Sequence, residues 1–259
     1  MSVFPSRLID LVFPGDTNHH GTLFGGAGLA LMDRVAFIAA TRHGRVPFVT
    51  ASCDRVDFQA PARVGEMVEL CARVLRVGRK SMSVEVEMTA EDLLSGERRL
   101  CTRGGFNMVA VPEGKGPDWR LPPLCDTADA PQAGLITSDI VFADQASSSG
   151  RMFGGEALAV MTKAAFVAAT RHGRRITVLA ASERVDFRAP VPVGAIVDTV
   201  ATMVAVGRTS MTVAVELWSE DLMSGARKLT ANGRFVMVAV DDRDRPVPVV
   251  PHEMLDNRS

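Results

Sequence analysis

Hydrophobic and polar residues alternate along one stretch of this chain and recur with a helical period along another. Residues 80–93 place Met and Val at every second position, with Ser and Glu between them. This period of two is typical of a strand with one buried face. The middle of the segment 25–43 is apolar almost all round, apart from Asp33 and Arg34, as in a helix covered by other structure. We predict a long helix there, with Gly44 as its left-handed cap.

Four further segments have strand character and surround this helix in the sequence: 7–13, 48–58, 66–77 and 97–111. Gly78-Arg79 and Ser95-Gly96 are typical of tight hairpin turns between antiparallel strands. The order is strand, helix, four strands. It predicts an α+β fold in which an antiparallel sheet curls around its helix.

The same pattern occurs twice. From Gly21 to Val111 the chain repeats at Gly150 to Val240, with a constant shift of 129 positions and no gap. A register kept for so long indicates a duplicated domain. We predict two domains, at 1–111 and 135–240, joined by a Pro- and Gly-containing linker at 112–134 and followed by an extended tail at 241–259.

The composition of the chain excludes some classes of function and of binding partner. The chain is 47% hydrophobic and 23% charged, so each half can bury its own core. A net charge of −1 without a basic run argues against nucleic acid or an anionic membrane as the main partner. We find no signal peptide and no apolar run of membrane length, and the four cysteines have no CxxC spacing. These features predict a cytoplasmic protein with buried, reduced thiols.

Asp33 is the strongest candidate for chemistry, because an acid inside an apolar helix must find a partner or lie in a cleft. It could act as a general base or nucleophile. It could equally form an ion pair with Arg34 or another surface cation. In the second copy the acid is replaced by Thr162, whereas Arg34 is matched by Lys163. This divergence suggests that one copy has lost a chemical role.

Other residues near the helix start allow two interpretations each. The paired glycines Gly25-Gly26 could expose backbone N–H groups to developing negative charge, or could serve close packing. Asn18 could orient a water or a carbonyl, or belong to an exposed turn, and its counterpart is Ser147. The turn residues Arg79 and Arg208 could be solvated charges or phosphate ligands.

Together, D-T-N-x-x-G-x-x-F-G-G, Met32-Asp33, F-x-x-P-x-x-V-G and V-G-R-x-S resemble the hot-dog acyl-CoA thioesterases. The likeness is to the branch with bacterial short-chain thioesterases and tandem-repeat cytosolic acyl-CoA hydrolases, and it covers both halves. The resemblance implies a double hot dog, with two antiparallel sheets, each wrapped around one long helix and paired edge to edge. It also implies an acyl-CoA substrate, no cofactor or metal, and a homo-oligomer, as a trimer of double hot dogs.

The resemblance further implies roles for individual residues. Asp33 matches the catalytic aspartate, Asn18 the catalytic asparagine, and the N–H near Gly26 would polarise the thioester carbonyl. The implied substrate-binding residues lie in the VGR-x-S turns or across the interface: Arg79, Ser81, Arg208, Ser210, Ser147 and Ser148.

In relatives the aspartate and the asparagine come from partnered hot dogs, whereas here both lie in the first half. Asp33 then works with a serine or a water, or first halves pair between chains, or activity is weak. The alternative function is a catalytically reduced acyl-CoA binding or regulatory protein on the same fold.

Overall fold

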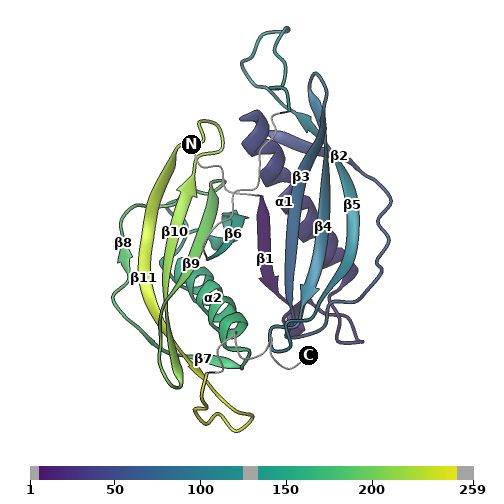
Figure 1. Ribbon diagram of the computed structural model, residues 1–259. Coiled ribbons are helices and arrows are strands. Elements are labelled where there is room, and N and C mark those ends of the chain that lie inside the picture. Colours follow the sequence, from purple (N-terminus) through teal and green to yellow (C-terminus); the bar gives the residue numbers. More distant parts are fainter. Residues whose placement is uncertain (1–5, 125–133, 250–259) are drawn as a thin grey trace.

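Two copies of one α+β unit form the computed structural model of the chain, which describes residues 6–124 and 134–249 (Figure 1). In the first copy, helix α1 (Gly25–Gly44) lies in the curve of a five-stranded antiparallel sheet with the order β1-β3-β4-β5-β2. A short 3-10 turn, η1 (Pro14–Asp16), separates the first strand from the helix. The strands are β1 (Arg7–Leu11), β2 (Phe48–Cys53), β3 (Met67–Val77), β4 (Ser81–Glu91) and β5 (Arg98–Ala110).

The second copy repeats this arrangement around helix α2 (Gly154–Gly173), with the strand order β6-β9-β10-β11-β7 and a short strand β8 paired to β11. Its other elements are β6 (Leu135–Ile140), η2 (Ala143–Gln145), β7 (Thr177–Ser182), β8 (Asp186–Phe187), β9 (Ile196–Val206), β10 (Ser210–Glu220) and β11 (Arg227–Ala239). Two antiparallel sheets, each wrapped around one long helix, confirm the predicted fold class.

The period of two in the sequence corresponds to the buried face of each central strand. Met82, Val84, Val86 and Met88 of β4 are all buried under α1, and Met211, Val213, Val215 and Leu217 of β10 are buried under α2. The helices meet these faces with small and apolar residues, so each unit has a packed core between helix and sheet.

The first helix ends one residue later than predicted. Gly44 is its last residue, and the left-handed cap is Arg45, with φ of 49°. A Cβ on Gly44 would lie 2.7 Å from the Phe48 ring, so glycine is required for close packing rather than for the cap. Arg45 holds its conformation with an ion pair, because its Nη1 lies 2.7 Å from Oε1 of Glu220 in the other half.

Strand β2 is shorter than the predicted 48–58 and forms one outer edge of its sheet. Because β2 is an edge strand with little covering it, Cys53 is exposed, and the prediction of buried thiols is wrong for this residue. Cys101 is buried and Cys71 is half-buried. Cys125 lies outside the described residues.

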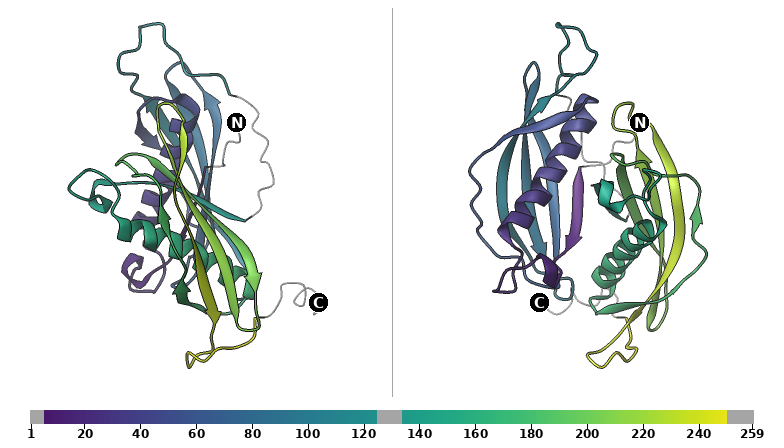
Figure 2. Two further views of the ribbon diagram at one scale, coloured as in Figure 1. Left: turned by 90° about the vertical axis from the view of Figure 1, so that its left-hand side faces the viewer. Right: turned by 180° about the vertical axis from the view of Figure 1, so that it is seen from behind.

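The two halves meet along the other edge of each sheet. Strands β1 and β6 lie side by side, and the N–H of Ile9 donates to Oγ1 of Thr137 at 2.8 Å (Figure 1). From behind, α1 and α2 lie on the same side of the two sheets (Figure 2). Ile38 of α1 packs with Ile140 and Ile196 of the second half, which adds an apolar cluster to the contact.

Charged side chains reinforce this contact twice, in equivalent positions. Nη2 of Arg42 lies 2.7 Å from Oδ1 of Asp198 and 2.9 Å from Oε2 of Glu220. Its counterpart, Arg171, reaches back to the first half, where Nη2 lies 2.6 Å from Oε2 of Glu91. The repeated pairs relate the two halves by an approximate two-fold axis.

The segments outside the two sheets contact their neighbouring domains. Leu121 of the predicted linker is buried against the first half, and Val249 of the predicted tail is buried against the second. The predicted domain boundaries remain a prediction, and 125–133 and 250–259 lie outside the described residues. No helix among the described residues is long and apolar enough to cross a membrane.

Candidate active site

Asp33 lies in the third turn of α1 and is half-buried. Its Oδ1 accepts a hydrogen bond of 2.6 Å from the hydroxyl of Thr50, which lies on the edge strand β2. The bond ties the acid to the outer edge of the first sheet. It also leaves Oδ2 of the carboxylate available to a water or a substrate.

The alternative ion pair between Asp33 and Arg34 does not form. Nη1 of Arg34 instead lies 3.2 Å from Oδ1 of Asp139 in the second half, and the equivalent Lys163 lies 2.7 Å from Oδ1 of Asp10. Both cations therefore serve the contact between the halves. Arg34 therefore has a structural role in this contact. Its charge does not pair with Asp33, so Asp33 remains a candidate for chemistry.

The start of α1 has backbone N–H groups without a side-chain cap. Phe24 occupies the N-cap position and makes no side-chain cap hydrogen bond. A Cβ on Gly26 would lie 2.6 Å from the Phe24 ring, so a larger residue would require that ring to move. The glycine therefore leaves room for the Phe24 ring to pack against the helix start. Gly155 and Phe153 repeat this geometry in the second half.

Asn18 holds the loop before the helix in shape. Its Nδ2 donates to Oγ1 of Thr22 at 3.0 Å, and its Oδ1 accepts from the N–H of His20 at 2.9 Å. The equivalent loop of the second half is held by Ser147, whose hydroxyl lies 2.8 Å from that of Ser149. No described hydrogen bond joins Asn18 or these serines to Asp33, so the structure does not bring the predicted site residues into direct contact.

The candidate CoA-binding arginines, Arg79 and Arg208, lie in exposed turns, as predicted. Nη2 of Arg79 donates to the carbonyl of Pro117 at 2.7 Å, so a residue of the predicted linker occupies its guanidinium. Ser81 follows the turn and its carbonyl accepts from Gly78. In the second half, Arg208 lies in the equivalent turn between β9 and β10, and Ser210 is the first residue of β10. The two turns belong to different halves.

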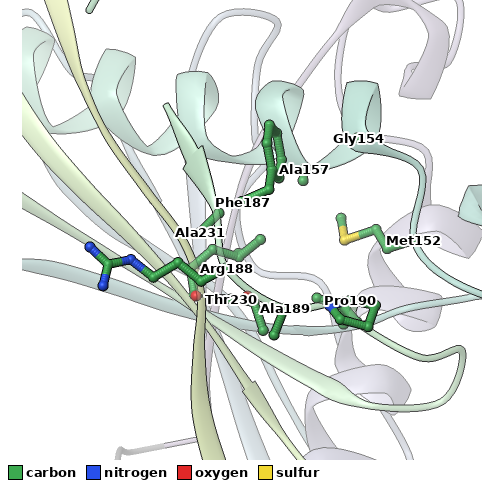
Figure 3. Close-up of a pocket in the computed structure, with 11 residues that line it drawn as sticks. Met152, Gly154, Ala157, Phe187, Arg188, Ala189, Pro190, Thr230 and Ala231 are labelled. Carbon is green, nitrogen blue, oxygen red and sulfur yellow. Dashed lines mark hydrogen bonds between the residues drawn. The ribbon is translucent and has the colours of Figure 1, made fainter. Parts of the chain in front are cut away.

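A hollow of about 280 Å³ lies at the start of α2, and Figure 3 shows its lining. The side chain of Arg188 points away from it, and its Nε donates to Oδ1 of Asn232 at 2.7 Å. The other lining residues are mostly apolar: Met152, Gly154, Ala157, Phe187, Ala189, Pro190, Val191, Leu217, Thr230 and Ala231. In the first half, the Phe58 ring, whose counterpart is Phe187, lies 3.6 Å from where a Cβ of Gly28 would be.

Sequence reasoning missed Thr50, the residue that contacts Asp33. A signal was present in the repeat, because the shift of 129 places Leu179 opposite Thr50 and Thr162 opposite Asp33. The acid and its hydrogen-bond donor are thus both replaced in the second half. No group of three or more potential metal ligands occurs within 6–124 or 134–249.

We compared the sequence and the structure with those of known proteins to find the family of the chain. The sequence model of the thioesterase superfamily matches residues 20–97 and 149–226, one match in each half. The chain belongs to the thioesterase superfamily. The two matches to this superfamily agree with the duplication, and each begins just before a long helix and ends beyond the hairpin turn between β4 and β5 or between β10 and β11.

A crystal structure of an acyl-CoA hydrolase from Agrobacterium tumefaciens is similar over nearly the whole length. It is 58% identical, with a TM-score of 0.86, and the match covers 94% of this chain and 96% of that one. This thioesterase-superfamily chain therefore shares its tandem architecture with a solved structure.

The match covers about half of the length of two curated relatives. The acyl-CoA thioester hydrolase YkhA of Bacillus subtilis is 45% identical over 100 residues, which is 39% of this chain and 58% of that protein. Mouse acyl-coenzyme A thioesterase 11 is 27% identical over 288 residues, which is 93% of this chain and 48% of that protein. The chain thus spans only about half the length of these two relatives.

Proposed function

We propose that this chain hydrolyses the thioester of an acyl-CoA to a free fatty acid and coenzyme A. Superfamily membership in both halves and the similarity to an acyl-CoA hydrolase over 94% of the chain support the reaction class. The single observation that carries the site is the Thr50–Asp33 hydrogen bond, which holds a half-buried carboxylate at the edge of the first sheet.

Thioester hydrolysis needs an activated nucleophile and a donor for the oxyanion. Asp33 supplies the carboxylate, as general base to a water or as nucleophile. The hydroxyl of Thr50 fixes its Oδ1 and so orients Oδ2. The N–H groups at Gly26 are uncapped by side chains and aim at the developing negative charge, which the helix dipole favours. Asn18 completes the set as a polar group in the preceding loop.

Arg79 and Arg208, with Ser81 and Ser210, serve as contacts for the phosphates of coenzyme A. Their turns are exposed, and charge-assisted hydrogen bonds to phosphate suit guanidinium groups. Arg79 must exchange the Pro117 carbonyl for a phosphate, whereas Arg208 has no such described side-chain partner. We assign Ser147 and Ser148 to the inactive counterpart of the Asn18 loop. The trimer of double hot dogs stays a prediction.

The test is release of free CoA thiol from acyl-CoA esters across a range of chain lengths, with binding of the same esters measured in parallel. Turnover that exceeds spontaneous hydrolysis supports the proposal. Binding without turnover would replace it with the acyl-CoA binding or regulatory protein.

A further inference from the structure

We propose that residues 112–124, called the strap from here on, regulate substrate binding in the first half: they occupy the guanidinium of Arg79 until a phosphate of coenzyme A displaces them. The inference rests on the proposed function, because it takes Arg79 as a contact for coenzyme A. It adds a regulating element to that contact, made of residues that lie outside both matches to the superfamily.

The strap follows β5 and turns back over one end of the first unit, beside the end of α1 (Figure 1). The N–H of Leu121 donates to the carbonyl of Arg79 at 3.0 Å, and Nε2 of His43 lies 2.9 Å from the carbonyl oxygen of Pro122. Leu121 is buried, and its Cδ2 lies 2.9 Å from where a Cβ of Gly44 would be. The strap is therefore docked between the turn that carries Arg79 and the last residues of α1.

The docked strap occupies the side chain of Arg79. Its Nη2 donates to the carbonyl of Pro117 at 2.7 Å, and Oδ1 of Asp118 lies 4.0 Å from the same nitrogen. With Nη2 engaged, a bidentate contact through both Nη atoms is not available to a phosphate. Both side chains are exposed, so water screens these interactions and the strap holds the guanidinium only weakly. A phosphate forms stronger, charge-assisted hydrogen bonds, and it can replace the neutral carbonyl.

The second half has the same backbone anchor but leaves its arginine open. The N–H of Val249 donates to the carbonyl of Arg208 at 2.9 Å, and Val249 is buried with its Cγ1 3.3 Å from where a Cβ of Gly173 would be. Among the described residues, the guanidinium of Arg208 has no hydrogen-bond or ion-pair partner. The contact with the guanidinium is thus specific to the half that carries Asp33, the candidate catalytic acid.

The strap lies at a distance from the reacting group. Asp33 precedes Gly44 by eleven residues of α1, which is about 16 Å along the helix axis. A contact at the end of the helix can reach the phosphates of coenzyme A, because the pantetheine arm separates them from the thioester. Release of the strap should therefore change KM and leave kcat unaltered.

Occupation of Arg79 lowers the apparent affinity for coenzyme A. The apparent Kd is the intrinsic Kd divided by the fraction of molecules in which the guanidinium is free. The net contribution of one hydrogen bond corresponds to about a 2- to 10-fold change in an equilibrium constant. A chain with a released strap should thus have a KM about 2- to 10-fold lower.

The two tryptophans of the chain allow a direct test of strap displacement. Trp119 belongs to the strap and is half-buried against the core of the first unit, whereas Trp218 lies on β10 of the second. In Trp218→Phe, emission therefore comes from Trp119 alone. Titration with coenzyme A should shift this emission to the red as Trp119 leaves its apolar contacts. In Trp119→Phe, the matched control, the emission of Trp218 should stay constant.

Calorimetric titration of the same proteins shows whether coenzyme A binds. Binding that leaves the Trp119 emission unchanged overturns the inference. Addition of Arg79→Ala to Trp218→Phe should abolish the red shift, and a shift that persists in this double variant also overturns it.

A matched pair of anchor variants tests the effect on affinity. Leu121→Ala loosens the strap, and Val249→Ala loosens the equivalent segment of the second half. Leu121→Ala should lower KM about 2- to 10-fold with kcat retained, and Val249→Ala should leave both unchanged. Asp118→Ala, at an exposed residue that leaves the packing intact, should lower KM in the same direction.

An unchanged KM in both Leu121→Ala and Asp118→Ala overturns the inference while the proposed function stands. If the unmodified chain binds coenzyme A and releases none from acyl-CoA, the proposed function fails, and the emission of Trp119 still decides whether the strap is displaced.

Discussion

The Thr50 hydroxyl donates to Asp33 across 2.6 Å, and this pair has no equivalent in the second half, where Leu179 and Thr162 occupy the two positions. The helix and the strand that carry the pair are present in both halves, with the same lengths. The halves thus share a scaffold and differ at the residues suited to chemistry. We expect the first half to carry the catalysis.

The role of Thr50 as a positioning residue can be tested by Thr50→Val, which keeps the shape and removes the hydroxyl. Loss of a hydrogen bond to a charged group corresponds to about 1.5–3 kcal/mol, so kcat should fall about 10- to 100-fold with KM nearly unchanged. Thr50→Ser should restore most of the rate because it restores the donor. Equal losses in both variants would show that packing, and not the hydrogen bond, is responsible.

Arg208→Ala should raise KM for acyl-CoA with little change in kcat, because an exposed turn cation contacts phosphate far from the reacting carbonyl. Arg79→Ala should act in the same direction. Steady-state kinetics on one acyl-CoA ester measure both. A large loss of kcat at constant KM would place these residues in the chemical step.

Arg42 should be essential to the contact between the halves. Its side chain is 5% exposed, and its removal leaves the buried Asp198 and Glu220 without this partner. Breaking a buried ion pair from one side costs about 3–5 kcal/mol, so Arg42→Ala should lower the free energy of unfolding by that order in a denaturant titration. Arg55→Ala, at an exposed ion pair, should change it by less than about 0.5 kcal/mol.

Acid should weaken the same contact through Glu91. Burial alone would raise the pKa of this carboxyl, but hydrogen bonds and charge from Arg171, with Arg174 and Arg98 nearby, outweigh burial and hold the pKa below its usual value. A lowered pKa in the folded state stabilises the fold above the unfolded pKa, and this stability is lost as pH falls through the folded pKa.

Thermal unfolding between pH 6 and pH 3 tests this expectation. The unmodified chain should lose stability as pH falls below about 4.5, the ordinary pKa of a glutamate. Glu91→Gln should be less stable at neutral pH and should lose less on acidification. The same slope in both proteins would exclude Glu91 as a source of the pH dependence.

The sequence predicts the fold well because its signals are local and repeated. The alternating residues of β4 and the unbroken apolar helix fix strand and helix, and the copy at β10 and α2 supports both. The end of α1 was missed by one residue, since the tight packing of Gly44 on Phe48 and the ion pair of Arg45 are tertiary contacts. The pattern of neighbouring residues in the sequence does not predict such contacts.

The site was predictable only in part, for a related reason. Asp33 is conspicuous as an acid in an apolar helix, but Thr50 looks like an ordinary strand residue until the fold places it 2.6 Å from the acid. The exposure of Cys53 likewise follows from the edge position of β2, which strand order decides and sequence periodicity does not.

The central claim is that this chain hydrolyses acyl-CoA at a site centred on Asp33 in the first half. The most direct measurement is CoA release by Asp33→Ala beside Thr162→Ala, the matched change in the second half, with circular dichroism to verify that both fold. Loss of a general base costs about 10²–10⁴-fold, so Asp33→Ala should be nearly inactive and Thr162→Ala close to normal. Near-normal turnover by Asp33→Ala, or its loss in Thr162→Ala, would contradict the account.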